Sequence, residues 1–169
     1  MQTGLVLHVP EVRSIVGPIR RKHDPAASVG MPPHVTLIYP FMDSRAFDAA
    51  ARRRLNSVCA TTSPISMRFK GCGMFDRVLW LAPEPEEPII GLVRSMAAAF
   101  PDYPPFGGAF AEIIPHLTVA HGDPSVFPKL QRRLERALAS ALEAEVRQIS
   151  WFGLSEEGWI ELGRFDLTG

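Results

Sequence analysis

The sequence predicts an α+β fold with two lobes related by an approximate two-fold axis, in which antiparallel sheets and flanking helices surround a central groove. The main observation is a repeat: Pro33–Leu37 (PHVTL) matches Pro115–Val119 (PHLTV), and the two copies start 82 residues apart. A looser match relates Gly73–Leu81 to Gly153–Leu162, which start 80 residues apart. The strands that close each half resemble hairpin partners rather than strands joined by helical crossovers, which favours antiparallel sheets.

The chain of 169 residues is the right length for one domain. We expect a single two-lobed domain over residues 1–169, with the first repeat in about residues 1–88 and the second in about residues 89–169. The acidic, proline-rich stretch Pro83–Pro88 (PEPEEP) marks the connection near the midpoint. Because 46% of the residues are apolar, the chain can form a core without disulfides or metals.

The zero net charge of the chain argues against partners that are large polyanions. The 18 Lys and Arg residues equal the 18 Asp and Glu residues, so no net charge attracts the chain to long nucleic acids or anionic membranes. A bound RNA would be held by an end or a short piece rather than along a duplex. The apolar run Leu5–Val9 is too short for a signal peptide and has no basic leader, so we expect a soluble, cytoplasmic protein.

The chain opens with a predicted strand and an irregular helix. Gly4–Val9 (GLVLHV) is short, apolar and rich in residues that favour strands. From Pro10 onward apolar residues recur at helical spacing, and Gly17 with Pro18 is expected to break this helix into two pieces. The composition of Asp24–Pro33 (DPAASVGMPP) predicts a loop.

The first copy of the repeat begins a strand–helix–strand–strand series. His34–Tyr39 (HVTLIY) predicts a strand. Asp43 or Ser44 is expected to cap the helix that follows, in which apolar residues recur at helical spacing. Strand patterns then follow at Ile65–Lys70 and Arg77–Ala82.

The second half repeats this series after an additional helix. Asp followed by Pro is a strong signal for the start of a helix, and a Gly/Glu-rich segment indicates a tight turn between the last two strands. The predicted elements are a helix at Ile89–Phe100, a loop at Pro101–Gly108, a strand at Glu112–Ala120, a helix that begins at Asp123 and Pro124, and strands at Glu145–Phe152 and Trp159–Phe165.

The repeated motif places an imidazole and a hydroxyl on one face of each strand. Residues i and i+2 of a strand point to the same side, roughly 6–7 Å apart, so His34 shares a face with Thr36 and His116 shares one with Thr118. If the lobes are related by a two-fold axis, both pairs line one groove. His121 should point to the other face if its strand continues.

Two imidazoles and two hydroxyls around one groove suit phosphodiester chemistry. An imidazole titrates near pH 6.5, so one of the two histidines can take a proton from an attacking water or hydroxyl, and the other can protonate the leaving oxygen. The threonine hydroxyls can donate to the non-bridging oxygens and hold the phosphate in line. This arrangement needs no metal and no cofactor, and it leaves open which histidine is the base.

Other candidates for substrate contact stand near the first motif. Tyr39 and Phe41 follow it where an aromatic ring can stack on a base, although core packing is the commoner role for each. His8 on the first strand can line the groove, with core packing or exposure as the alternatives. The basic run Arg20–Lys22 can reach a substrate phosphate, although such a run more often forms a solvated face.

The segments PPHVTLIYPF and IPHLTVAHG, together with an opening strand followed by Pro10 and Glu11, resemble the two-histidine (2H) phosphoesterase superfamily, in particular its bacterial 2′-5′ RNA ligase-like branch. The superfamily includes 2′-5′ RNA ligases and 2′,3′-cyclic phosphodiesterases. The resemblance spans most of the chain and implies a two-lobed fold with a pseudo-two-fold groove. It implies metal-independent opening of a cyclic phosphate, or the reversible joining reaction.

The resemblance carries the catalytic role onto His34 and His116 and the phosphate-binding role onto Thr36 and Thr118. The expected partner is a small cyclic-phosphate nucleotide or an RNA terminus, while substrate, bond specificity and oligomeric state stay open. Two alternatives remain. A noncatalytic module can use the same groove to bind a nucleotide or RNA end, and two facing histidines can form a metal site, although no Asp, Glu or Cys set with ligand spacing accompanies them.

Overall fold

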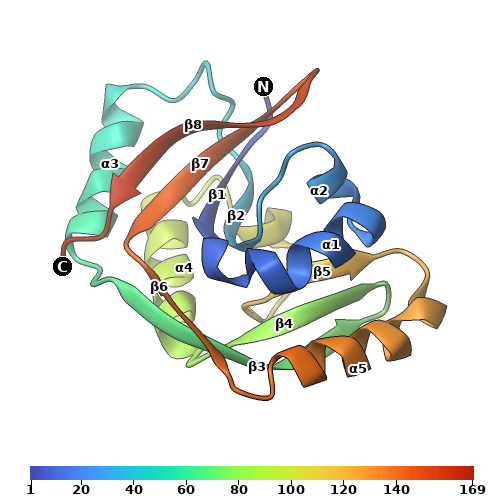
Figure 1. The fold of residues 1–169 in the computed structure, drawn as a ribbon. Helices are drawn as coiled ribbons and strands as arrows, with labels where there is room; N and C mark the ends of the chain where they lie inside the picture. Colours follow the sequence, from blue (N-terminus) through green and yellow to red (C-terminus); the bar gives the residue numbers. More distant parts are fainter.

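The computed structural model describes residues 1–169 and contains two four-stranded antiparallel sheets with five α-helices around them (Figure 1). Sheet A has the strand order β2–β1–β7–β8, with bounds His34–Phe41, Thr3–His8, Gln148–Ser155 and Gly158–Asp166. Sheet B has the order β5–β4–β3–β6, with bounds Leu117–His121, Val78–Glu84, Ile65–Phe75 and Leu142–Val146. The helices are α1 (Arg13–His23), α2 (Pro25–Ser28), α3 (Ala49–Ala60), α4 (Glu87–Ala99) and α5 (Phe127–Ala137). The predicted fold class is confirmed.

The two sheets do not correspond to the two halves of the chain. Sheet A combines β1 and β2 with β7 and β8, and sheet B combines β3 and β4 with β5 and β6, so each sheet takes strands from both halves. The chain passes from sheet B to sheet A at Arg147, between Val146 at the end of β6 and Gln148 at the start of β7. The two sequence repeats therefore do not each supply one complete sheet.

Two helices also link the sheets, because each connects strands of one sheet and packs on a strand of the other. Helix α1 connects two strands of sheet A but packs on β5 of sheet B, next to α5. Helix α4 connects two strands of sheet B but packs on β2 of sheet A, beside α3 (Figure 1). One cluster of 37 buried apolar residues, drawn from both sheets and these helices, forms the core. Each motif strand is thus packed against a helix that connects two strands of the other sheet: α4 packs on β2, and α1 packs on β5.

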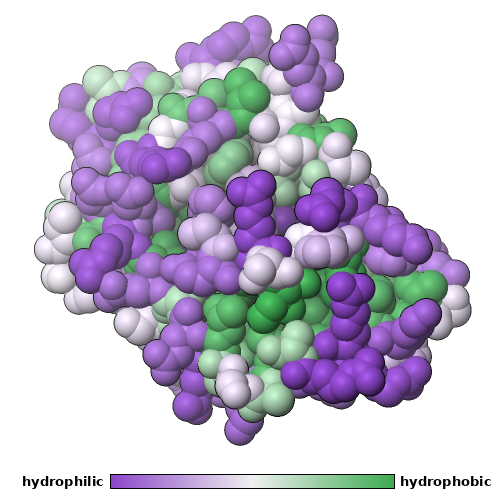
Figure 2. Space-filling view, in the orientation of Figure 1, coloured by the Kyte–Doolittle hydropathy of each residue, from purple (hydrophilic) through white to green (hydrophobic).

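Hydrophilic residues cover most of the face shown in Figure 2, and hydrophobic ones gather in its lower half around α1 and α5. None of the helices is both long and apolar enough to cross a membrane.

The first motif strand contains a β-bulge directly after its threonine. In the ladder between β1 and β2, Val6 lies opposite Thr36 and Leu5 lies opposite Ile38. Leu37 is therefore an extra residue on β2. A bulge of this kind bends the strand and reverses the side-chain alternation beyond it.

The second motif strand has the same bulge at the equivalent place. Between β4 and β5, Trp80 lies opposite Thr118 and Leu79 lies opposite Ala120, which leaves Val119 as the extra residue. The two motif strands therefore share not only their sequence but also the same pairing defect, and β1 in sheet A corresponds to β4 in sheet B. This equivalence is the local two-fold relation that the repeat predicted.

The helix α1 is longer and less broken than the sequence indicated. It runs continuously through Gly17 and Pro18. Pro18 is exposed, so the hydrogen bond that its missing N–H removes is lost on the solvent side, while Val16 and Ile19 are buried against the core. Packing on one face therefore outweighs the proline, and the predicted break was wrong.

The predicted cap of the next helix was also wrong. Asp48 caps α3, because its side chain accepts a backbone N–H bond in the first turn. Asp43 instead accepts hydrogen bonds from the amino terminus of Met1 and from Arg45.

Two predicted strands differ from those observed. The strand expected at Glu112–Ala120 begins only at Leu117, because Pro115 has no N–H to donate to a ladder. The strand expected at Glu145–Phe152 is divided at Arg147 between the two sheets.

Candidate active site

Both motif histidines hold the same ring nitrogen against the backbone. Nδ1 of His34 lies 2.8 Å from the carbonyl oxygen of Pro32, and Nδ1 of His116 lies 2.7 Å from that of Ile114. A carbonyl oxygen only accepts, so Nδ1 carries the proton in each ring. Nε2 of the neutral ring is therefore an unprotonated acceptor that can receive a proton. The backbone fixes this tautomer twice, in the same way.

The structure brings the two motifs together. Strands β2 and β5 are the edge strands of their sheets, and their Cα atoms come within 8 Å of one another. His34, Thr36, His116 and Thr118 are all half-buried. A charge on His116 also lowers the pKa of His34, which agrees with their proximity.

His34 lies in a setting that disfavours its protonated form. Burial is the main cause that lowers its pKa, to about 4, and the buried guanidinium of Arg20 acts in the same direction. The bond to the Pro32 carbonyl acts in the opposite direction but is the weaker influence. His34 is therefore neutral at pH 7 in the free protein.

His116 lies among aromatic rings from three separate segments. Its ring is 5.1 Å from Phe75, 6.0 Å from Trp80 and 5.9 Å from Phe106, with the Phe106 ring stacked on it. Burial lowers the pKa of His116, and the bond to the carbonyl of Ile114 opposes this effect. Phe106 has a φ of 52°, a conformation that costs energy for a non-glycine residue. The chain thus holds an aromatic side chain over the imidazole in spite of backbone strain.

His8 occupies the position across the ladder from His34. The two residues are Cα partners in β1 and β2, and a directly opposed pair shares one face of the sheet. His8 is half-buried, and burial is the main cause that lowers its pKa. The structure therefore places His8 beside the first motif, on the sheet face that carries His34.

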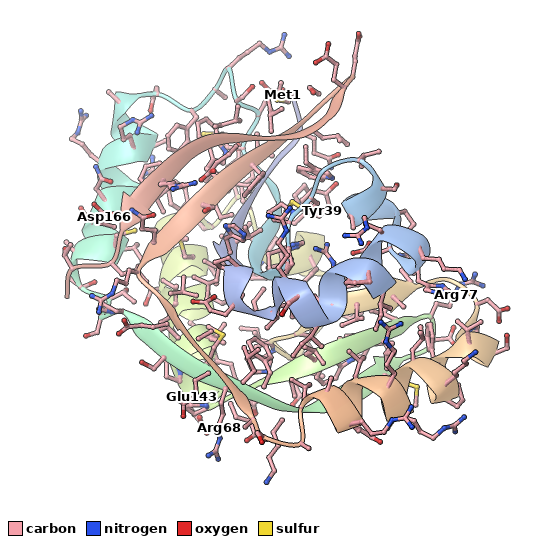
Figure 3. The ribbon with its side chains drawn as sticks, in the orientation of Figure 1. Met1, Tyr39, Arg68, Arg77, Glu143 and Asp166 are labelled. Atoms are coloured by element: carbon pink, nitrogen blue, oxygen red, sulfur yellow. The ribbon has the colours of Figure 1, made fainter.

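The two aromatic candidates have different positions. Tyr39 (labelled in Figure 3) is half-buried over Gly4, a residue on the same face of β1 as His8. Its ring and that of Trp159 pack edge to face, with their centroids 5.8 Å apart. Phe41 is only 4% exposed and packs in the core, so it cannot contact a substrate. Phe41 is withdrawn as a candidate because its ring packs against Phe100 at the end of α4 and against Tyr103 in the loop that follows.

The bulge also corrects the expectation for His121. Val78 lies opposite His121 and shares a strand face with Trp80, which lies opposite Thr118. His121 therefore lies on the same side as Thr118, not on the other face, and it is exposed.

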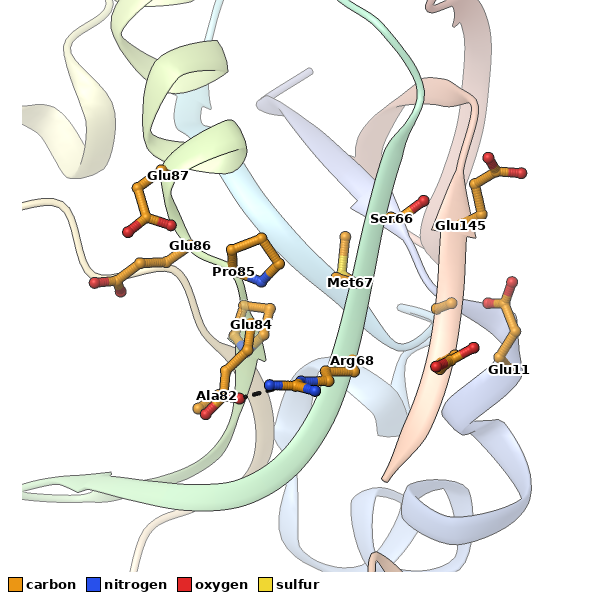
Figure 4. A pocket seen from close by; sticks show the side chains of 13 residues that line it. Glu11, Ser66, Met67, Arg68, Ala82, Glu84, Pro85, Glu86, Glu87 and Glu145 are labelled. Atoms are coloured by element: carbon orange, nitrogen blue, oxygen red, sulfur yellow. Dashed lines mark ion pairs between the residues drawn. The ribbon is translucent and has the colours of Figure 1, made fainter. Parts of the chain in front are cut away.

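A large cavity elsewhere in the molecule is acidic (Figure 4). Its volume is about 940 Å³, and its charged lining consists of Arg68 with Glu11, Glu84, Glu86, Glu87, Glu143 and Glu145. Figure 3 places Arg68 and Glu143 at the lower left, well separated from Tyr39. The six carboxylates repel a phosphate, so this cavity does not suit the chemistry of the motifs.

A smaller cavity of about 420 Å³ adjoins the first motif and is basic. Its lining includes His8, Arg13, Arg20 and Arg21, and Glu161 is its one carboxylate. No group of three His, Cys, Asp or Glu side chains is arranged to hold a metal ion.

Sequence reasoning missed two parts of this region. The ion pair between Arg20 and Asp24 is buried, at 2% and 4% exposure, although both residues were expected in solvated or loop segments. The signal was present, because the two residues are four apart in a helix and Asp24 also caps α2. The aromatic surroundings of His116 had no such signal, since Phe75 and Trp80 of the β3–β4 hairpin and Phe106 of a loop meet it only through the fold.

Known proteins resemble this chain in sequence. Residues 8–152 match the 2′-5′ RNA ligase superfamily. A protein of Bacillus pumilus named "Putative phosphoesterase" is 30% identical over 124 residues, which cover 71% of this chain and 70% of that protein. A protein of Bacillus licheniformis with a similar name is 26% identical over 125 residues, with the same coverage.

Solved structures resemble it in fold. TT0787 of Thermus thermophilus has a TM-score of 0.70 at 20% identity and covers 100% of this chain and 99% of its own. LigT of E. coli, solved in complex with 3′-AMP, has a TM-score of 0.59 at 17% identity and covers 99% and 98%. At these identities the likeness concerns the fold alone. The match over residues 8–152 shows the family: this chain belongs to the 2′-5′ RNA ligase superfamily.

Proposed function

We propose that this protein is a metal-independent phosphoesterase that acts on the 2′,3′-cyclic phosphates of nucleotides or RNA ends, as a cyclic phosphodiesterase, a reversible 2′-5′ RNA ligase, or both. The observation that carries the proposal is the matched presentation of His34 and His116. Each commits Nδ1 to the carbonyl two residues before it. His34 begins β2 and His116 directly precedes β5, and these two edge strands are neighbours. The E. coli LigT structures with 3′-AMP and with phosphate are consistent with such a ligand.

In this proposal the phosphorus atom lies between the two Nε2 atoms. One imidazole takes a proton from water, or from a ribose hydroxyl in the joining direction, as the oxygen bonds to phosphorus. The bond from phosphorus to one ribose oxygen breaks, and the other imidazole protonates that oxygen. Thr36 and Thr118 donate hydrogen bonds to the non-bridging oxygens, which gain charge as the fifth bond forms.

The reaction needs one neutral and one protonated imidazole. Burial lowers the pKa of both His34 and His116, so both rings are neutral in most free molecules at pH 7. An anionic phosphate between the rings stabilises the imidazolium form and raises these pKa values again. The substrate therefore helps to bring in the proton that its own leaving group requires.

The test is an assay in EDTA with 2′,3′-cyclic nucleotides and with RNA that ends in a cyclic phosphate. We expect the unaltered protein to open the ring, and His34→Ala and His116→Ala each to abolish turnover. His23→Ala, at the end of α1, is the matched histidine control and should keep the activity. Turnover that survives either motif substitution would contradict the assignment, and binding without product would favour the noncatalytic module.

A further inference from the structure

The basic cavity beside the first motif has walls from both ends of the chain. Its lining includes Arg13, Arg20 and Arg21 of α1, His8 of β1 and Glu161 of β8. The loop after α2 is joined to β8, because the N–H of Trp159 donates to the carbonyl oxygen of Val29 at 2.7 Å. The volume of about 420 Å³ is in the range of sites for small molecules.

The cavity is continuous with the surroundings of His34. Pro32 lines the cavity, and its carbonyl oxygen is the one that fixes the imidazole of His34. His8 lines the cavity and is also the Cα partner of His34 across the ladder. A group in this cavity would therefore lie close to a phosphate held at the first motif.

The charges around the cavity leave a positive excess. Arg20 is paired with Asp24, and Glu161 is paired with Arg164. Arg13 and Arg21 have no ion pair anywhere in the molecule, and both are exposed at the mouth of the cavity. Two guanidiniums without carboxylate partners favour an anion, and their donor geometry suits phosphate.

A buried ion pair fixes the end of the helix that lines the cavity. Arg20 is 2% exposed, and its Nε donates to Asp24 at 2.9 Å. Its Nη2 lies 2.8 Å from the same carboxylate oxygen. The pair therefore holds the last turn of α1, which also carries Arg21, in a fixed position.

The helix face also keeps the cavity open. Gly17 lies between Arg13 and Arg21, and a Cβ at Gly17 would already touch atoms of both side chains at 3.7 Å. A larger side chain there would fill the space between the two guanidiniums. The glycine thus leaves room for a group between them.

We propose that this cavity is a second phosphate subsite, so that the preferred substrate carries one phosphate at the histidines and another at Arg13, Arg20 and Arg21. This proposal rests on the proposed function for the first phosphate. The second phosphate is either the internucleotide phosphodiester of an RNA end or the 5′-phosphate of a nucleotide. A nucleoside cyclic monophosphate, which has only one phosphate, would leave the subsite empty.

Equilibrium binding of nonreactive ligands tests the subsite without any turnover. Adenosine 3′-monophosphate is compared by calorimetry with adenosine 3′,5′-bisphosphate and with a diadenosine that ends in a 3′-phosphate, at fixed ionic strength because exposed charges are screened by salt. We expect at least one of the two-phosphate ligands to bind on the order of tenfold more tightly, and the better of the two identifies the source. Arg13→Gln and Arg21→Gln should reduce this ratio to about twofold.

Lys22→Gln is the matched control, because it removes one positive charge from the same helix but from a residue that does not line the cavity. It should leave the ratio unchanged. A ratio near one in the unaltered protein, or an equal loss in Lys22→Gln, would overturn the subsite, as would the absence of any binding. Tighter binding of two-phosphate ligands without turnover of cyclic phosphates would overturn the proposed function alone.

Discussion

His34 and His116 present the same ring nitrogen, because each donates its Nδ1 proton to the carbonyl oxygen two residues before it in the chain. The residue between the histidine and that carbonyl is a proline in both motifs, which has no N–H to compete for position. A ring fixed in this way loses little freedom when a phosphate binds. The two imidazoles are thereby oriented before the substrate arrives.

Catalysis should depend on the hydroxyl groups of both motif threonines. Thr36→Val and Thr118→Val keep the shape of the side chain but remove the donor, so kcat should fall by about 10²–10³-fold for each, as for other lost oxyanion donors. Thr36→Ser and Thr118→Ser keep the hydroxyl and should retain most of the activity. Steady-state kinetics on a cyclic nucleotide measures this, and full activity in either valine variant would remove that threonine from the site.

The pH dependence of catalysis should be displaced to the acid side. Burial lowers the pKa of His34 to about 4 and also lowers that of His116, so the singly protonated pair in the free protein is most abundant below pH 6.5. A profile of kcat/KM should be bell-shaped, rising as the pH falls from about 8 and declining again near pH 4. A flat profile between about pH 5 and 9, or a maximum above about pH 7, would contradict this expectation.

Stability should respond to the same shift. The pKa of His34 is lower in the folded than in the unfolded chain, so the unfolded chain takes up the proton first as the pH falls. The contribution of His34 to the free energy of unfolding is therefore fully present above pH 6.5 and is lost as the pH falls toward 4. His34→Gln cannot take up this proton, so it should lose less stability between about pH 7 and pH 4.5, by on the order of 1–2 kcal/mol after allowance for solvent screening. Urea unfolding at both pH values measures the difference. Parallel losses in the two proteins would mean that His34 titrates normally.

Gly73 should be intolerant of a side chain because of Trp80. A Cβ at Gly73 would lie 2.1 Å from the indole ring, which packs across this strand beside His116. Gly73→Ala should therefore destabilise the fold by about 1–3 kcal/mol and lower activity by moving the indole. Gly71→Ala is the control on the same strand, since no atom lies within 4 Å of its Cβ. Thermal unfolding of both variants gives the comparison, and equal melting temperatures would show that the indole yields without cost.

Local patterns predicted the elements that carry the motifs, because their signals are local. Alternating apolar residues indicated β2 and β3, and helical spacing indicated α3, α4 and α5. The hairpin-like ends of both halves were also recognised. The same signals could not reveal that the sheets exchange strands, because a strand has the same sequence pattern whichever half supplies its neighbour.

The parts of the site that were missed depend on register and on distant segments. The bulges at Leu37 and Val119 leave no mark in the sequence, yet they bring Tyr39 and His121 onto the strand faces that carry Thr36 and Thr118. The break at Arg147 did have a signal, since the alternation of polar and apolar residues from Glu143 to Val146 is interrupted by two consecutive polar residues, Arg147 and Gln148. Whether a proline such as Pro18 breaks a helix depends on which side of the helix it faces, and the sequence does not show which side packs on the core.

The central claim is that His34 and His116 act as one unit on a single phosphate. Its most direct test is a double-mutant cycle of kcat/KM on a cyclic-phosphate substrate, with His34→Ala, His116→Ala and the double variant. Residues that act as a unit are strongly non-additive, so each single substitution should remove nearly all of the rate and the double variant should be no slower than either. If the two losses multiply, or if one single variant keeps the unaltered rate, the two histidines do not share a reaction and the proposed mechanism is wrong.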